Sequence, residues 1–152
     1  MKIVRVTTLE SFRRFRDNVT ETYDTEERLI EHLTGKFEGN VKTEIGSEFH
    51  KLIETGLTSS NSVKIFSNSQ IIKAVNHRDA VSPFISEVRN YKKYGKIVVT
   101  GAVDVLQGSI IRDTKVKFKP VLMSEYENSY QWRFYLDIFE IDTFIYDVFE
   151  VI

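Results

Sequence analysis

Two neighbouring segments carry carboxylates and a lysine at spacings that suit phosphate chemistry with a divalent metal ion. Asp104 lies near the end of residues 97–106, a predicted strand in which almost every other residue is apolar. Burying a lone carboxylate costs several kcal/mol unless a partner or a metal ion neutralises it. Asp113 and Lys115 are two residues apart on the next predicted strand, 110–118, so their side chains share one face. Two carboxylates suit Mg²⁺ or Mn²⁺, and a lysine beside them can stabilise charge that develops on a phosphate.

The turn between these two strands decides whether the carboxylates meet. A two-residue turn at Gln107-Gly108 would pair Asp104 with Ile111 and make Asp104 and Asp113 diagonal neighbours, roughly 7–8 Å apart at the backbone. A three-residue turn would put Asp104 on the opposite face. The alternative that stays open is a structural ion pair between Asp113 and a lysine of its own strand.

Two predicted helices contribute polar residues at the edges of their apolar faces. Residues 44–55 follow the helical rule, and His50 and Glu54 lie one turn apart at one border of the apolar stripe. In residues 125–139, Gln131 falls inside a broad apolar arc, with Tyr135 one turn further on. A buried amide must find hydrogen-bond partners. Ordinary alternatives are a satisfied histidine and a core glutamine bonded to a carbonyl, and we assign no role to His32 or His77.

The elements that must position these residues follow from periodicity and from turn residues. Residues 8–17 and 24–34 are predicted as helices, with Thr8 capping the first and Arg13, Arg14 and Arg16 off its apolar face. Residues 55–62 read as a loop and 68–81 as a helix. The remaining predictions are strands at 84–91, 97–106, 110–118 and 143–151. The sequence therefore predicts a single α/β domain over residues 1–152, with a sheet and helices packed on it.

Composition excludes several classes of site. The chain has 152 residues, a mass of 17.7 kDa and no cysteine. A disulfide scaffold, a cysteine nucleophile, a thiolate zinc site and an iron–sulfur cluster are thus excluded. No apolar run approaches the roughly 18 residues of a spanning helix, and the first residues lack the apolar core of a signal peptide. We therefore expect a cytoplasmic protein that does not enter a membrane.

The net charge of −1 hides a local basic stretch. Residues 89–119 contain only two acidic residues, whereas 120–152 are strongly acidic. Such a stretch can follow a phosphate backbone, or it can be the solvated lysine edge of a sheet. Its cations are Arg89, Lys92, Lys93, Lys96, Arg112, Lys115, Lys117 and Lys119.

Taken together, the motifs resemble the PD-(D/E)XK nuclease superfamily and specifically its RecB-like branch. In that branch a helix histidine, a G-x-x-D strand, a D-x-K strand and a Q-x-x-x-Y helix follow one another in this order. Here they match residues 46–54, Gly101 to Asp104, Asp113 to Lys115, and Gln131 to Tyr135. Residues 8–15 also resemble the first helix of the family, so the resemblance spans nearly the whole chain.

The resemblance implies a restriction-endonuclease-like fold, in which a central mixed β-sheet is flanked by α-helices, and metal-dependent hydrolysis of DNA phosphodiesters. His50, Asp104 and Asp113 would bind Mg²⁺ or Mn²⁺ through their side chains. The carbonyl of Thr114 would complete this metal site, and Glu54 could contribute through water.

The same resemblance implies roles for three further residues. Lys115 would orient or activate the attacking water and stabilise the charged transition state. Gln131 and Tyr135 would brace the site and contact the DNA backbone. The basic stretch would then be a phosphate path that Arg13, Arg14 and Arg16 could extend.

We therefore expect a DNA nuclease, in particular an exonuclease of recombination, repair or phage replication. Because the chain is short and has no motor, it would act with a protein partner, as a homo-oligomer or distributively. Two alternatives are a non-catalytic DNA-binding relative and an interaction domain whose carboxylates and lysines form ion pairs. The interaction domain predicts that Asp104 and Asp113 point to different faces and bind no divalent ion.

Overall fold

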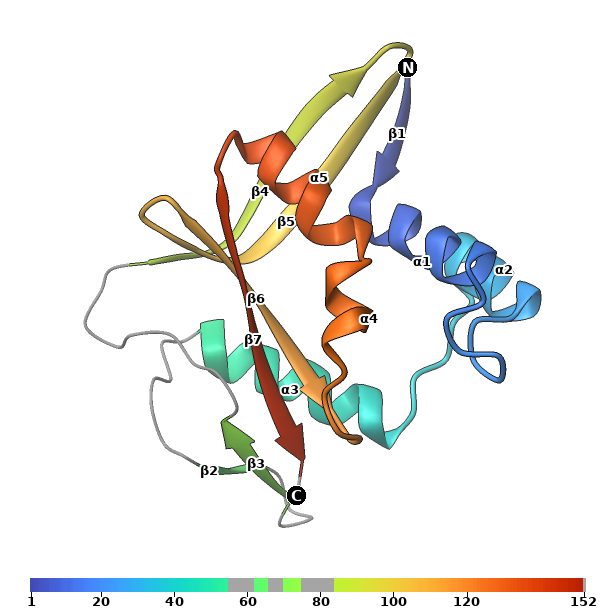
Figure 1. The fold of residues 1–152 in the computed structure, drawn as a ribbon. Coiled ribbons are helices and arrows are strands. Elements are labelled where there is room, and N and C mark those ends of the chain that lie inside the picture. Colours follow the sequence, from blue (N-terminus) through green and yellow to red (C-terminus); the bar gives the residue numbers. More distant parts are fainter. Residues whose placement is uncertain (55–61, 66–69, 75–83, 152) are drawn as a thin grey trace. The chain divides into compact units, whose positions relative to one another are not determined.

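The computed structural model describes residues 1–54, 62–65, 70–74 and 84–151, and side chains are described for residues 1–51 and 84–149. After one strand, three helices precede five strands, and two further helices precede the last strand of the described chain (Figure 1). In order, the elements are β1 (Lys2–Arg5), α1 (Val6–Arg16), α2 (Glu26–Thr34), α3 (Val41–Glu54), β2 (Ser62–Ile65), β3 (Gln70–Ala74), β4 (Ile85–Tyr94), β5 (Ile97–Gln107), β6 (Ile110–Lys117), α4 (Met123–Glu127), α5 (Tyr130–Phe139) and β7 (Thr143–Val151).

The strands form a mixed sheet in the order β1-β5-β6-β7-β3-β2, and β4 pairs with β5. The β1–β5 and β6–β7 pairs are parallel, whereas β5–β6, β3–β7 and β2–β3 are antiparallel. The predicted α/β class, with a mixed sheet and helices packed on it, is confirmed. Within the described part of the chain, no helix is both long and apolar enough to cross a membrane.

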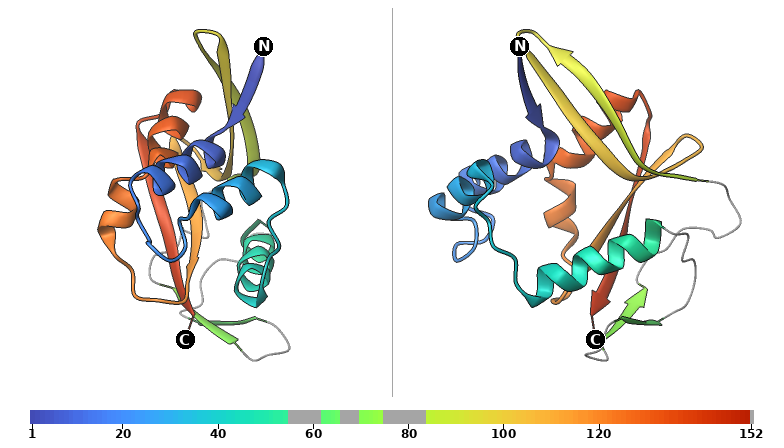
Figure 2. Two further views of the ribbon diagram at one scale, coloured as in Figure 1. Left: turned by 90° about the vertical axis from the view of Figure 1, so that its right-hand side faces the viewer. Right: turned by 180° about the vertical axis from the view of Figure 1, so that it is seen from behind.

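The chain divides into two compact units, each assembled from three segments. Unit 1 comprises Met1–Glu38, Arg89–Ala102 and Met123–Glu140. In this unit α1 packs against both α2 and α5, and β1 lies beside the first half of β5 (Figure 2). Its buried apolar residues are Val6, Leu29, Val99, Tyr126, Tyr135 and Ile138.

Unit 2 comprises Gly39–Val88, Val103–Leu122 and Ile141–Ile152. Here β6 and β7 run side by side from the pair Ile110–Thr143 to the pair Lys117–Glu150, and α3 packs on β6 (Figure 2). The buried apolar residues of this unit are Ile45, Phe49, Val103, Val105, Ile111, Val148 and Phe149.

Helix α1 differs from its prediction at its start and in the face it buries. It begins at Val6, and its N-cap is Arg5, whose side chain makes no capping bond, so the predicted cap at Thr8 is wrong. Val6 and Arg13 are its buried residues, whereas Phe12 is exposed. Arg13 overrides the apolar pattern because carboxylates on α1 surround its guanidinium.

Two segments change type or divide where tertiary contacts override local pattern. The predicted helix 68–81 is wrong over Gln70–Ala74, which form β3 and pair with β7. A short apolar run of this kind does not distinguish a helix from a strand, and the pairing partner decides. The predicted helix 125–139 is two helices, α4 and α5. The break lies at Ser129, whose side-chain oxygen caps α5 by accepting a hydrogen bond from the backbone N–H of Gln131. The predicted loop 55–62 lies outside the described residues except for Ser62, which begins β2.

Candidate metal centre

Helix α3 carries His50 at the edge of a buried face. Ile45 and Phe49 are buried as predicted, and the ring of Phe49 contacts that of Phe149 at a centroid distance of 4.5 Å. This packing fixes the rotation of α3 on the strands of unit 2. His50, the next residue along the helix, stays partly open to solvent. The side chains of Leu52, Ile53 and Glu54 lie outside the described residues.

The turn between β5 and β6 lies one residue later than predicted. It consists of Gly108 and Ser109, and Gly108 has a φ of +58°, which glycine adopts without strain. Leu106 is therefore the residue opposite Ile111. The predicted pairing of Ile111 with Asp104 is wrong, because Asp104 lies two positions earlier in β5. A shift of two positions preserves which side chains share a face. Asp104 and Asp113 thus remain on the same face of the two strands.

Four residues of unit 2 meet around the carboxylate of Asp104. Its Oδ2 atom accepts the backbone N–H of Thr114 at 2.7 Å and lies 3.4 Å from Nδ1 of His50. The Nζ atom of Lys115 lies 2.6 Å from Oδ2 of Asp113. The structure thus brings together the predicted residues from α3, β5 and β6.

Burial decreases from the centre of this cluster to its rim. The side chain of Asp113 is 4% exposed and that of Asp104 17%, whereas Lys115 and His50 are 31% and 33% exposed. The carboxylates are therefore poorly solvated, while the imidazole and the ammonium group border solvent. This gradient is what a small polar ligand needs to reach the carboxylates.

Two ionisable groups of the cluster, Asp104 and Lys115, have shifted pKa values. Burial and the charge of Asp113 raise the pKa of Asp104 to about 7, against the opposing influence of the Thr114 amide and Lys115. Burial disfavours the charged form of Lys115, but attraction to Asp113 outweighs it and the pKa of Lys115 is raised. Burial, with the charge of Asp113 as the second cause, thus makes Asp104 resist ionisation. Perturbed groups of this kind concentrate at functional sites.

Glu87 on β4 also acts on the charge of Asp104, and the sequence pattern did not single it out. Its negative charge is a further cause of the raised pKa of Asp104. Glu87 has a φ of +54°, an uncommon conformation for a residue other than glycine. No sequence motif distinguishes it from the other charged residues of β4.

The donor set at this cluster fits a divalent cation. Two carboxylates and a backbone carbonyl are oxygen ligands of the kind Mg²⁺ and Mn²⁺ prefer, and an imidazole suits the softer of the two ions. Among the residues that the structure describes, no three His, Asp or Glu side chains already form a group able to hold an ion. Since Asp113 contacts Lys115, binding an ion would require this carboxylate to exchange its ammonium partner for the metal.

Gln131 and Tyr135 belong to unit 1 and are both buried on α5. A methyl group added at Gly101 would overlap the ring of Tyr135 and approach Val6 at 3.2 Å. The glycine of the G-x-x-D motif therefore leaves room for the tyrosine of the Q-x-x-x-Y motif. This contact gives Tyr135 a packing role, and the predicted roles of Gln131 and Tyr135 toward the metal site and DNA remain predictions.

The predicted basic stretch divides between the two units, and several of its cations have partners. In unit 1, Lys92 pairs with Asp137 at 2.8 Å. In unit 2, Arg112 pairs with Asp147 at 2.8 Å, and Lys115 pairs with Asp113. The stretch is thus not a row of unpaired cations.

The arginines of α1 also have carboxylate partners, and their predicted extension of a phosphate path remains a prediction. Arg13 is buried and pairs with Glu10 at 2.8 Å. Arg14 pairs with Asp24 at 2.9 Å, and Arg16 lies 2.8 Å from the carboxylate of Asp17. These ion pairs stabilise unit 1 internally.

Comparison of the chain with models of protein families, with curated proteins and with solved structures finds no match.

Proposed function

We propose that this protein is a divalent-metal-dependent deoxyribonuclease of the PD-(D/E)XK type. The observation that carries the proposal is the cluster on one face of β5 and β6, in which Asp104 lies 3.4 Å from His50 and Asp113 lies 2.6 Å from Lys115. Burial and, after it, the charge of Asp113 raise the pKa of Asp104, so the two carboxylates repel each other. A divalent cation between them would relieve this repulsion. The lysine and the histidine at the rim supply the other groups that the resemblance implies.

The metal ligands would be His50, Asp104, Asp113 and the carbonyl of Thr114. Bound Mg²⁺ or Mn²⁺ would supply charge neutralisation at the phosphate and would make water a stronger nucleophile near neutral pH. His50 is held by α3 beside Asp104, so its ring is close to the carboxylate with which it would share the ion. The Thr114 amide keeps Asp104 oriented through its 2.7 Å hydrogen bond.

Lys115 would act on the reacting groups once Asp113 binds the ion. Its ammonium group carries three donors, which can hold the attacking water and a non-bridging phosphate oxygen. In the reaction the water oxygen would form a bond to phosphorus and lose a proton, the ester P–O bond would break, and the leaving alcohol oxygen would take up a proton, so that one proton passes in net from the water to the alcohol. Because the pKa of Lys115 is raised, its ammonium form is retained for electrostatic stabilisation.

An ion-paired interaction domain is the second candidate, and the 2.6 Å contact between Lys115 and Asp113 favours it. In that case the lysine is the permanent counter-ion of the carboxylate. The two candidates differ in one property, which is whether a divalent ion displaces the lysine.

Cleavage of end-labelled DNA tests the proposal. Linear and closed circular substrates, single- and double-stranded, are incubated with Mn²⁺, Mg²⁺ or EDTA. We compare the wild-type protein with Asp113→Asn and with Asp142→Asn, which changes an exposed carboxylate of the same unit. Metal-dependent cleavage that only Asp113→Asn loses is the expected result. Loss of closed circles would identify endonuclease action, and loss of linear substrates alone would identify an exonuclease.

Absence of cleavage under every condition, with folded protein, would contradict the proposal. DNA binding by the same samples would then indicate a non-catalytic DNA-binding module. Absence of both cleavage and binding would favour the interaction domain.

A further inference from the structure

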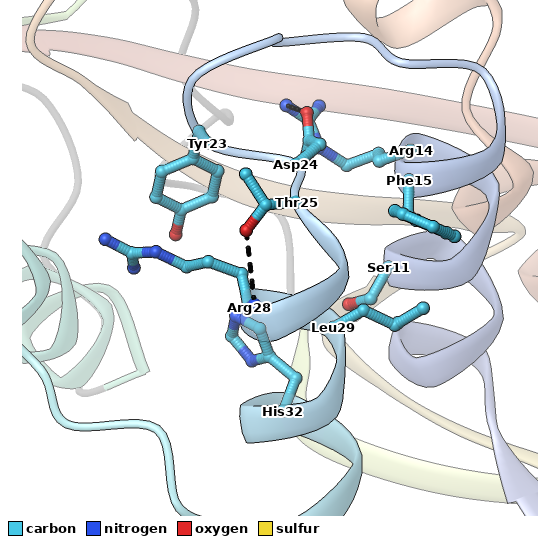
Figure 3. Close-up of a pocket in the computed structure, with 9 residues that line it drawn as sticks. All are labelled: Ser11, Arg14, Phe15, Tyr23, Asp24, Thr25, Arg28, Leu29 and His32. Carbon is cyan, nitrogen blue, oxygen red and sulfur yellow. Dashed lines mark hydrogen bonds and ion pairs between the residues drawn. The ribbon is translucent and has the colours of Figure 1, made fainter.

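Unit 1 contains a pocket between α1 and α2 that none of the residues proposed for catalysis lines. Its volume is about 200 Å³. Figure 3 shows Ser11 and Phe15 of α1 on one side, and Tyr23, Thr25 and Arg28 on the other. A space of this size can hold a phosphate group and part of an organic body, and the rest of a larger ligand would extend beyond it.

The charges at this pocket leave one cation available. Arg14 and Asp24 neutralise each other through two hydrogen bonds, from Nε to Oδ1 at 3.0 Å and from Nη2 to Oδ2 at 2.9 Å. Arg28 makes no ion pair with any carboxylate of the described part of the chain. The pocket is therefore positive at Arg28, and the charge of its carboxylate, Asp24, is already neutralised by Arg14.

Aromatic rings orient the guanidinium of Arg28. Its Cζ lies 4.5 Å from the ring centroid of Tyr23 and 5.7 Å from that of Phe37. The ring of His32, one turn further along α2, stacks on Phe37 at 4.3 Å with an interplanar angle of 16°. Contact through its π-face leaves the N–H edge of a guanidinium available, and this edge matches an oxoanion with two parallel hydrogen bonds.

Further donors and an apolar wall define the class of ligand. The hydroxyl oxygen of Thr25 accepts the backbone N–H of Arg28 at 3.3 Å, so its own hydrogen can be donated. The hydroxyl of Tyr23 and the imidazole of His32 also line the pocket. Together with the guanidinium of Arg28, these residues provide four donor groups. A carboxylate has two oxygens to accept them, whereas a phosphate monoester has three terminal oxygens and so matches the donors better. The apolar side chains of Phe15 and Leu29 would contact its organic part.

We propose that the α1–α2 pocket binds a phosphate monoester, with Arg28 as its main anion-binding residue. The monoester can be a free small molecule or the phosphorylated end of a nucleic acid strand, since both present the same group. This inference does not rest on the proposed nuclease activity.

Isothermal titration calorimetry in EDTA tests the pocket without metal-dependent cleavage. The probes are inorganic phosphate, deoxyadenosine monophosphate and deoxyadenosine, together with one oligonucleotide with and without a terminal phosphate. The variants are Arg28→Gln, Tyr23→Phe and, as a matched control outside the pocket, Arg5→Gln. Circular dichroism establishes that each variant is folded.

Saturable binding of the monophosphate, with at least tenfold weaker binding of deoxyadenosine, is the expected result. Arg28→Gln should weaken it at least tenfold and Tyr23→Phe roughly three- to tenfold, while Arg5→Gln should leave it unchanged. Preference for the phosphorylated oligonucleotide over the mononucleotide would identify a strand end as the ligand, and the reverse a small molecule. Equal binding by Arg28→Gln and Arg5→Gln, or no binding of any phosphorylated probe, would overturn the proposal whatever the cleavage assay shows.

Discussion

Replacing Asp104 by asparagine should stabilise the metal-free protein at alkaline pH and not at acidic pH. The pKa of Asp104 rises from 3.8 to about 7 because of burial and the charge of Asp113. Between about pH 4 and pH 7 the folded protein therefore holds a proton that the unfolded chain has released. Stability falls as the pH rises through this window, because the unfolded state then binds fewer protons.

The size of this loss of stability follows from the shift in the pKa of Asp104. Three pKa units at about 1.4 kcal/mol each give an upper limit of about 4 kcal/mol. About two of these units, or about 2.8 kcal/mol, lie between pH 5 and pH 8, and because Asp113 shares the site we expect about half of this, roughly 1.4 kcal/mol. Asparagine cannot ionise, and its Oδ1 can still accept the Thr114 amide that Asp104 accepts at 2.7 Å.

Urea unfolding in EDTA at pH 5 and pH 8 measures this difference. The stability of Asp104→Asn relative to the wild-type protein should be greater at pH 8 than at pH 5, because at pH 5 the wild-type protein has lost only part of its proton-linked stability. Glu21→Gln, which alters an exposed carboxylate, should follow the wild-type protein at both pH values. An Asp104→Asn variant destabilised equally at the two pH values would refute the reasoning, because the carboxylate would then be stabilising when ionised.

Two further predictions concern unit 1. Gly101→Ala should destabilise the protein by about 1–3 kcal/mol in urea unfolding, because the added methyl group overlaps the ring of Tyr135. Gly46→Ala should be neutral or stabilising, because the added methyl group meets open space. Equal effects of the two substitutions would contradict the packing of Gly101 against Tyr135. Arg13→Met should cost about 3 kcal/mol because Arg13 is only 2% exposed and its loss leaves the charge of Glu10, among the described residues, with no cation and with only the Tyr130 amide as donor. Arg16→Met should cost less than about 1 kcal/mol because Arg16 is 50% exposed. A smaller loss for Arg13→Met than for Arg16→Met would show that the buried pair contributes little.

The parts of the fold that sequence predicts best are those with long, unambiguous patterns. The strands around Asp104 and Asp113 and the helix carrying His50 occur where periodicity places them. Residues 2–5 and 70–74 were missed as strands because four or five residues carry too little pattern, and pairing with β5 or β7 supplies the missing energy.

Sequence pattern also has limits at the candidate site. The pattern of the two strands places Asp104 and Asp113 on one face. It cannot choose between a turn at Gln107-Gly108 and a turn at Gly108-Ser109, and the resulting strand registers differ by two residues. Sequence pattern treats Arg13 as polar and therefore exposed, although carboxylates on the same helix make its burial possible. It does not find the α1–α2 pocket, because Tyr23, Arg28 and His32 acquire a shared environment only when the two helices pack.

In the proposed nuclease, Asp104 and Asp113 form a divalent-ion site in which Lys115 serves chemistry rather than structure. Electron paramagnetic resonance of Mn²⁺ measures free and bound ion directly, and the same samples can be assayed for DNA cleavage. We expect Asp113→Asn to lose both binding and cleavage. Lys115→Met should bind Mn²⁺ at least as tightly as the wild-type protein, because it removes the competing cation 2.6 Å from Asp113, yet it should not cleave. Absence of Mn²⁺ binding in both the wild-type protein and Lys115→Met would contradict the account.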